Sequence, residues 1–248
     1  MKQNGVYNMK VITLDSAAEI GCAAGEAFVQ TVLEKPNAVL GLATGATPLP
    51  TYDYMADACR AGRVSFKNVS TFNLDEYCDL PKTHKNSYYS FMFENLFSKI
   101  DVCADNVHFL DGNAPDAEAE SARYAAEIEA AGGIDIQFLG IGRNGHIAFN
   151  EPSDHFTNNA FKVKLSESTI EANSIYFDDV PMPRYAMTMG IGSVMRARKI
   201  ILVATGKAKA EAVRAMILGE IDPHCPASIL KAHPDCTVLL DTDAASLL

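Results

Sequence analysis

Two adjacent carboxylates near residue 75 have the chemistry needed for proton transfer. Asp75 and Glu76 follow the apolar run Val69–Asn73, which reads as a buried strand. A carboxylate at the end of such a strand can act as a general base while its neighbour is structural or faces solvent. A solvated acidic loop would give the same pair of residues. The pair alone therefore leaves both interpretations open.

A histidine on a glycine-rich segment is the second candidate. The segment 140–152 reads Gly-Ile-Gly-Arg-Asn-Gly-His-Ile-Ala-Phe-Asn-Glu-Pro, with three glycines in six residues, then His146, and Glu151 five residues further on. Glycines permit a tight loop, and a histidine set on it near a carboxylate is typical of an acid–base pair, although a lone histidine is usually structural. The G-x-G-x-x-G spacing indicates dinucleotide binding only weakly, because no helical pattern follows.

Two other segments could hold an anion. Ala43-Thr-Gly-Ala-Thr-Pro48 lies between a predicted strand and a helix start, where small residues and free backbone N–H groups suit a phosphate. It lacks Walker-type spacing, and an ordinary strand–helix turn would look similar. Thr205–Lys209 places Lys207 and Lys209 at another helix start, and one of these lysines is expected to be merely solvated.

Composition limits the classes of function. The 248 residues are 48% hydrophobic and 21% charged, as in ordinary globular proteins. The net charge of −10 argues against non-specific nucleic-acid binding. No apolar run approaches the roughly 18 residues of a membrane span, and the N-terminus has no apolar stretch of signal-peptide type. We therefore expect a cytoplasmic protein without a membrane or nucleic-acid partner.

No metal site or disulfide is predicted. The six histidines include no close ligand pair, and the six cysteines lie far apart without a C-x-x-C pair. Dispersed cysteines in a chain without an export signal are interpreted as reduced thiols.

The elements that must position these residues alternate between short apolar runs and amphipathic stretches, which favours a mainly parallel sheet covered by helices. Strands are predicted at 10–14, 38–43, 69–73, 134–139, 186–189, 200–204 and 237–240. Helices are predicted at 16–34, after Thr47 as a cap with Pro48 in the first turn, and at 86–97, 115–131 and 207–218. The aromatic-rich helix 86–97 is interpreted as core-facing. No linker or repeat divides residues 1–248, which predicts one domain.

The four candidate segments all follow predicted strands. In open α/β sheets ligands collect beyond the carboxyl ends of the strands, so we expect these segments to form one site.

Together these segments resemble the glucosamine-6-phosphate deaminase family. The likeness extends from Lys10 to the C-terminus and is carried by 42–48, 72–77, 140–152 and Ala186-Met-Thr-Met-Gly190. Its most specific element is Gly145-His-Ile-Ala-Phe-Asn-Glu-Pro152, since the related 6-phosphogluconolactonases share a similar Gly-His element but lack the Phe-Asn-Glu-Pro continuation. The resemblance implies an α/β, single-domain, modified Rossmann-like fold, with a mainly parallel sheet flanked by helices on both faces. It also implies no metal or nucleotide cofactor.

The resemblance further implies a reaction, in which glucosamine 6-phosphate and water give fructose 6-phosphate and ammonia. Asp75 would move a proton between C2 and C1, and His146 would open the sugar ring. Glu151 would support and tune that histidine, and Asn144 would help to orient it. The implied phosphate-binding residues are Thr44, Gly45, Ala46, Thr47 and Lys209.

Three departures from the family pattern concern mainly the phosphate end. Asn144 stands where many members have an acid, and an amide cannot stabilise a charged imidazole as a carboxylate would. Ile175 stands where an arginine usually binds phosphate, and isoleucine cannot replace it. The segment 158–161 reads Asn-Asn-Ala-Phe in place of a Ser-Arg-Thr-Arg/His segment. The candidates for a replacement cation are Lys207, Arg143 and Arg184.

Alternative functions remain open at this point. One is a lactonase-like sugar-phosphate hydrolase, and another is a deaminase of a different amino-sugar phosphate such as galactosamine 6-phosphate. A third is a non-catalytic sugar-phosphate sensor, although no DNA-binding segment is visible. Ending at Leu248, the chain lacks the longer tail of allosteric hexameric members. We therefore expect a monomer or small homo-oligomer that N-acetylglucosamine 6-phosphate does not activate.

Overall fold

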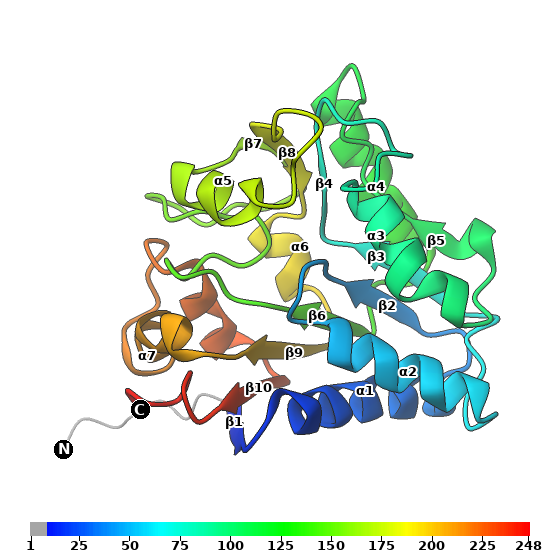
Figure 1. The fold of residues 1–248 in the computed structure, drawn as a ribbon, viewed down its shortest axis with the longest axis horizontal. Helices are drawn as coiled ribbons and strands as arrows, with labels where there is room; N and C mark the ends of the chain where they lie inside the picture. Colours follow the sequence, from blue (N-terminus) through cyan, green and yellow to red (C-terminus); the bar gives the residue numbers. More distant parts are fainter. Residues whose placement is uncertain (1–8) are drawn as a thin grey trace.

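A seven-stranded parallel sheet forms the centre of the molecule (Figure 1). The computed structural model describes residues 9–248. In spatial order the strands are β1 (Met9–Leu14), β10 (Cys236–Asp241), β9 (Lys199–Ala204), β6 (Ile136–Leu139), β2 (Val39–Leu42), β3 (Ser70–Asn73) and β5 (Val107–His108). Every residue of β2 and β6 is buried, as expected for central strands of a parallel sheet covered on both faces.

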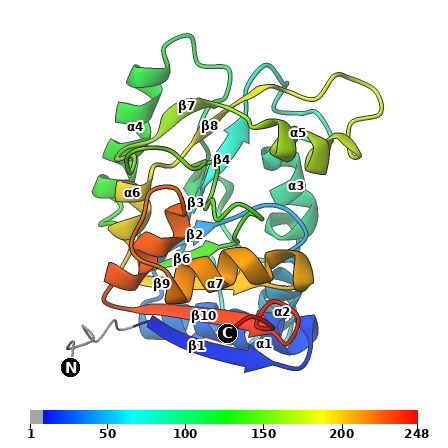
Figure 2. The same ribbon diagram turned by 90° about the vertical axis from the view of Figure 1, so that its left-hand side faces the viewer.

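Helices cover both faces of this sheet. In chain order the helices are α1 (Ala17–Glu34), α2 (Leu49–Arg60), α3 (Tyr88–Asn95), α4 (Ala117–Ala130), α5 (Glu167–Ser174), α6 (Ile191–Met195) and α7 (Ala210–Leu218), of which α5 lies beside the smaller sheet described below. Short 3-10 turns lie at η1 (Phe97–Lys99), η2 (Ala104–Asn106), η3 (Lys207–Lys209) and η4 (Pro226–Ala232). In Figure 2, α7 lies in front of the sheet, while α1 and α2 pack against each other behind it. This arrangement confirms the predicted α/β class.

The two predicted helix starts near residues 16 and 47 differ in outcome. Ser16 caps α1 as expected, since its side chain accepts a hydrogen bond from the Glu19 backbone N–H, and the Glu19 carboxylate accepts one from Asp15. The prediction of Thr47 as the cap of α2 is wrong. Pro48 occupies the N-cap position, and no side chain caps this helix. Pro48 and Pro50 have no backbone N–H, and the Leu49 N–H donates to the Ala46 carbonyl at 3.3 Å, so the first residues of α2 offer few N–H groups to another acceptor.

A smaller antiparallel sheet stands beside the large one. It contains β4 (Asp75–Tyr77), β8 (Tyr185–Thr188) and β7 (Phe161–Lys164), in the order β4–β8–β7. β4 follows β3 after a single residue, Leu74, so the chain passes directly from the large sheet to the small one. The predicted strand 186–189 belongs to this small sheet, and β4, β7 and α5 were not predicted.

The order of the strands creates a crevice between β2 and β6. From β2 the chain continues through α2 to β3 on one side, whereas the chain after β6 reaches β9 on the opposite side. The loops after these two strands therefore diverge, which is the topological switch point where open α/β sheets bind ligands. Across residues 9–248, none of the helices is long and apolar enough to traverse a bilayer.

Candidate active site

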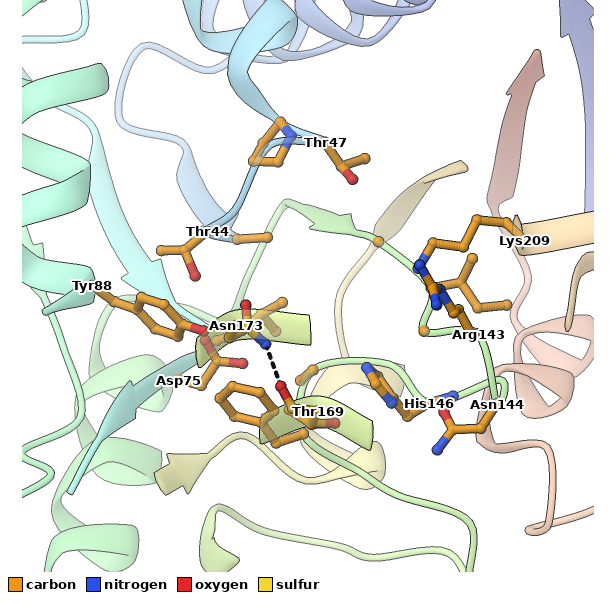
Figure 3. A pocket seen from close by; sticks show the side chains of 18 of the residues that line it. Thr44, Thr47, Asp75, Tyr88, Arg143, Asn144, His146, Thr169, Asn173 and Lys209 are labelled. Carbon is orange, nitrogen blue, oxygen red and sulfur yellow. Dashed lines mark hydrogen bonds between the residues drawn. The ribbon is translucent and has the colours of Figure 1, made fainter. Parts of the chain in front are cut away.

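A cavity of about 770 Å³ lies at the carboxyl ends of β2, β3 and β6. It brings together predicted residues from four separate segments, namely Thr44, Thr47, Asp75, Asn144, His146 and Lys209 (Figure 3). Asp75 and His146 thus share one cavity, although 70 residues separate them in the chain. The crevice at the switch point is the physical origin of this meeting.

Asp75 is a nearly buried carboxylate at the cavity wall. Only 6% of the residue is exposed, and no donor among residues 9–248 hydrogen-bonds to its side chain. Burial, reinforced by the nearby charge of Glu76, raises the pKa of Asp75 to about 8. A carboxyl group that titrates near neutral pH can both take up and return a proton, as a general base must.

Glu76 is directed away from the cavity by the alternation of β4. Its Oε1 accepts hydrogen bonds from the backbone N–H groups of Tyr77 and Tyr88, each at 2.9 Å, and its Oε2 accepts one from Tyr89 at 2.9 Å. Glu76 thereby neutralises the free N–H groups at the start of α3. Of the two adjacent acids, one lines the cavity and the other holds a helix.

The glycine loop after β6 fits closely around His146. A Cβ atom at position 142 would lie 2.3 Å from the imidazole, and a Cβ at position 145 would lie 2.7 Å from the Cys225 sulfur. Gly145 also has φ +84°, a conformation that favours glycine. Ala148 adopts φ +49° and lines the same cavity. The predicted need for small residues in this loop has a steric basis at both glycines.

Glu151 pairs with His146 below the cavity floor. Its Oε2 lies 3.4 Å from Nδ1 of His146, within ion-pair distance, although the contact does not have hydrogen-bond geometry. The Oε1 atom accepts hydrogen bonds from Thr169 at 2.7 Å and Ser166 at 3.0 Å. Burial raises the pKa of Glu151, but interactions with His146, Thr169 and Asn144 outweigh this effect and lower it to about 2. Glu151 is therefore a permanent negative charge beside the imidazole.

Asn144 contacts this pair through the Glu151 carboxylate and the backbone of His146. Its side-chain amide donates to Oε2 of Glu151 at 2.6 Å, and its Oδ1 accepts the backbone N–H of His146 at 3.2 Å. The amide contacts the carboxylate and the loop backbone, so Asn144 orients the pair without adding a second charge.

The loop after β2 presents open backbone amides. Gly45 has φ +99°, and Gly45 and Ala46 are exposed. Among residues 9–248, no protein acceptor takes the backbone N–H groups of Gly45, Ala46 or Thr47. Together with the hydroxyls of Thr44 and Thr47 in the cavity, these donors make the segment a candidate anion-binding turn.

Two cations face this turn across the cavity. Lys209 and Arg143 lie side by side in Figure 3, and both line the cavity. Burial and the neighbouring charge of Arg143 lower the pKa of Lys209. Neither side chain has an acidic partner within 4.0 Å in the part of the chain that the structure describes. Two neighbouring cations without a counter-ion favour a bound anion.

The other candidate cations lie elsewhere. Lys207 is exposed and does not line the cavity, and Arg184 pairs with Glu167 at 3.5 Å, also outside it. Ile175 lines the cavity mouth with 77% of its surface exposed. Of the three replacement cations suggested by the sequence, Arg143 is the one in position.

The cavity residues that the sequence analysis missed include Tyr88 and Thr169. Tyr88 was assigned to a core-facing helix, yet it lines the cavity and shares hydrogen bonds with Thr44 and Tyr77. Thr169 lies on α5, which was not predicted. The pattern Ser166-x-x-Thr169 could have indicated a capped helix start there, since Ser166 accepts the Thr169 backbone N–H at 3.2 Å.

Comparison with known proteins identifies the family. Residues 15–239 match the model of the glucosamine-6-phosphate isomerases/6-phosphogluconolactonase family. The chain belongs to this family. Among its relatives, the glucosamine-6-phosphate deaminase of Thermoanaerobacter pseudethanolicus is 48% identical over 241 residues, covering 97% of this chain and 95% of the relative. That of Bacillus pumilus is 44% identical, covering 96% of this chain and the whole relative.

Solved structures of the family agree with the fold. A monomeric glucosamine-6-phosphate deaminase superposes with a TM-score of 0.93 at 44% identity, covering 97% of this chain and 100% of the other. A 6-phosphogluconolactonase from Trypanosoma cruzi gives a TM-score of 0.80 at 19% identity, covering 99% of both chains, and supports the fold alone. The predicted modified Rossmann-like fold and the predicted family are confirmed.

Proposed function

We propose that this protein is a glucosamine-6-phosphate deaminase, which converts glucosamine 6-phosphate and water to fructose 6-phosphate and ammonia. The observation that carries the proposal is one cavity that is lined by Asp75, by His146 and by the Lys209–Arg143 pair. An amino-sugar phosphate needs a proton shuttle at C1 and C2 and an anion site at C6. The relatives named above carry the same activity in their names.

The phosphate end supplies binding and orientation. The phosphate would accept hydrogen bonds from the amides of the Gly45–Thr47 turn and from the threonine hydroxyls, and would pair with Lys209 and Arg143. Holding the remote phosphate fixes the reacting carbons beside Asp75, and such orientation is a large source of rate acceleration.

The acid–base end carries out the chemistry. His146 would take the proton of the anomeric hydroxyl and deliver one to the ring oxygen, which opens the ring to the aldehyde. Asp75 would then remove the C2 proton while a proton of the substrate's ammonium group passes to O1, which gives an enolamine, and Asp75 would return its proton to C1, leaving a protonated imine at C2. Addition of water to this imine and loss of ammonia give the ketose phosphate. Glu151 would stabilise the imidazolium that forms during ring opening.

The decisive assay measures ammonia and fructose 6-phosphate released from glucosamine 6-phosphate by the purified protein. Galactosamine 6-phosphate and 6-phosphogluconolactone serve as competing substrates. We expect Asp75→Asn to lower turnover at least 1000-fold, and Asp79→Asn, in an exposed turn just after β4, to leave it unchanged. Lactone hydrolysis without ammonia release, or full turnover by Asp75→Asn, would contradict the proposal.

A monomer is the proposed state of assembly. It is supported by the close structural similarity to a deaminase described as monomeric. The cytoplasmic location expected from the sequence stays a prediction.

A further inference from the structure

Helix α5 is both a wall of the cavity and a support for its acid–base pair. Glu171, Asn173 and Ile175 line the cavity from the second half of α5 and its C-cap. Ser166, the N-cap, and Thr169, in the first turn, contact Glu151, and Thr169 also lines the cavity. One short helix therefore touches both the space for the sugar and the carboxylate beside His146.

At the start of α5, the hydroxyl groups of Ser166 and Thr169 each have only one proton to donate. Ser166 Oγ lies within donating distance of both Glu151 Oε1, at 3.0 Å, and Thr169 Oγ1, at 2.9 Å. Thr169 Oγ1 lies closer to Oε1, at 2.7 Å. The consistent assignment has Thr169 donating to Glu151, with Ser166 donating to the same carboxylate or to the threonine oxygen.

The two carboxylate oxygens of Glu151 therefore contact side chains from two different parts of the chain. The α5 hydroxyls occupy Oε1, while Oε2 receives the Asn144 amide at 2.6 Å and faces Nδ1 of His146 at 3.4 Å. Thr169 is 5% exposed, so water competes poorly for its hydrogen bond. With Oε1 fixed, the carboxylate cannot rotate Oε2 away from the imidazole.

We propose that Thr169 is a positioning residue, whose hydroxyl holds Glu151 so that His146 keeps its proton on Nδ1 and leaves Nε2 free for the sugar. This inference rests on the proposed deaminase function for its kinetic consequence. Through Thr169, the position of α5 at the cavity wall governs the orientation of the His146–Glu151 pair.

The kinetic test compares Thr169→Val with Thr169→Ser. Valine keeps the branched shape but removes the hydroxyl, whereas serine keeps the hydroxyl and removes a methyl group. We expect Thr169→Val to lower kcat for glucosamine 6-phosphate by about tenfold, near 1.4 kcal/mol in barrier height, with KM within about twofold. Thr169→Ser should recover most of the loss. A change in KM alone, or an equal loss in both variants, would show that Thr169 only shapes the wall and would overturn the proposal.

A matched control separates this effect from general loss of a helical hydroxyl. Thr31 lies on α1 and is not among the residues that line the cavity. Its hydroxyl donates to the Ala27 carbonyl at 2.8 Å. Thr31→Val should leave kcat and KM unchanged. Thermal unfolding of each variant checks that α5 remains folded.

A spectroscopic test does not depend on catalysis. Imidazole ¹⁵N shifts, assigned with His146→Gln, report which ring nitrogen carries the proton. We expect the Nδ1–H form to dominate in the unmodified protein and in Thr169→Ser, and to lose population in Thr169→Val. Identical His146 spectra in all three proteins would overturn the inference, even if the protein proved to act on a different substrate. Absence of ammonia release with the expected spectral change would instead contradict only the proposed function.

Discussion

Asp75 combines a chemical advantage with a thermodynamic cost. A carboxyl group in this position titrates near 8 because burial disfavours its charge, and the charge of Glu76 adds to the effect. The unfolded chain would ionise the same group near its ordinary pKa of about 4. Ionisation of Asp75, which the reaction requires, therefore destabilises the folded state relative to the unfolded chain.

The stability of the protein should reveal this penalty. Because the folded pKa of Asp75 lies above the unfolded value, its contribution destabilises the fold progressively as pH rises from about 4 to about 8. We expect Asp75→Asn to raise the free energy of unfolding by about 2–4 kcal/mol at pH 8 and by little near pH 4. Denaturant unfolding at both pH values measures this. Equal effects at the two values would contradict it, and Asp79→Asn provides the exposed control.

The pH dependence of activity follows from the same group. If the ionised carboxylate of Asp75 is the base, kcat/KM should fall about tenfold per pH unit below an apparent pKa near 8. Glu76→Gln removes the nearby charge and should move this limb to lower pH. A pH–rate profile of both proteins is the measurement. An acid limb near pH 4 would contradict the raised pKa of Asp75.

Arg143 should contribute to substrate binding. Its charge lies beside Lys209 at the phosphate end of the cavity. We expect Arg143→Ala to raise KM for glucosamine 6-phosphate about tenfold, corresponding to about 1.4 kcal/mol. Arg184→Ala removes an exposed arginine that pairs with Glu167 outside the cavity, and should leave KM within twofold. Equal KM values for the two variants would mean that Arg143 does not contact the phosphate.

At the scale of elements, the turn between β2 and α2 depends on one backbone conformation. Gly45 has φ +99° with open space where a Cβ would stand, so an added methyl group meets strain without a steric clash. Gly62, with φ +69° and equally open surroundings, is its match in the turn after α2.

Alanine substitutions at the two glycines should separate binding from stability. Both Gly45→Ala and Gly62→Ala are expected to cost about 1 kcal/mol of folding free energy. KM should rise several-fold in Gly45→Ala alone, because a shifted turn misplaces the amides that face the phosphate. Steady-state kinetics and thermal unfolding of both variants provide the test. An unchanged KM in Gly45→Ala would argue against the anion-binding turn.

Elements with a clear periodic pattern were predictable from the sequence. The central strands and α1, α4 and α7 were located to within about three residues at each end, because buried parallel strands are continuous apolar runs and these helices are long. β4 has three residues, including Asp75 and Glu76, and such a short polar strand gives no apolar signal. α5 has eight residues, most of them polar, and it was also not predicted, which is why Thr169 was missed.

The sequence indicated which segments form the candidate site, but not how their side chains are arranged around the cavity. Glycine, histidine and carboxylate patterns located His146, Asp75 and the turn after β2. Which neighbouring side chain faces the cavity depends on tertiary contacts that no local pattern encodes. Arg143 and Lys207 were equal candidates in the sequence, and only the fold places Arg143 beside Lys209.

For the molecule as a whole, the proposed state is a single copy. Asp75, His146, Arg143 and Lys209 line one cavity within a single copy of the chain. We expect sedimentation to give one species near 26.8 kDa over a wide range of concentration, with constant specific activity. Activity that rises with protein concentration would instead indicate an obligate oligomer.

The order of Asp75 and Glu76 carries information beyond their charge. Glu76, whose carboxylate points toward α3, accepts hydrogen bonds from three backbone amides and has the longer side chain of the two residues. An aspartate there would stop one methylene short of the helix, and a glutamate in the preceding position would intrude on the space for the sugar. Exchanging Asp75 and Glu76 would leave the composition and net charge unchanged. The exchanged chain would lose the hydrogen bonds that hold the start of α3 and would also lose a correctly placed base.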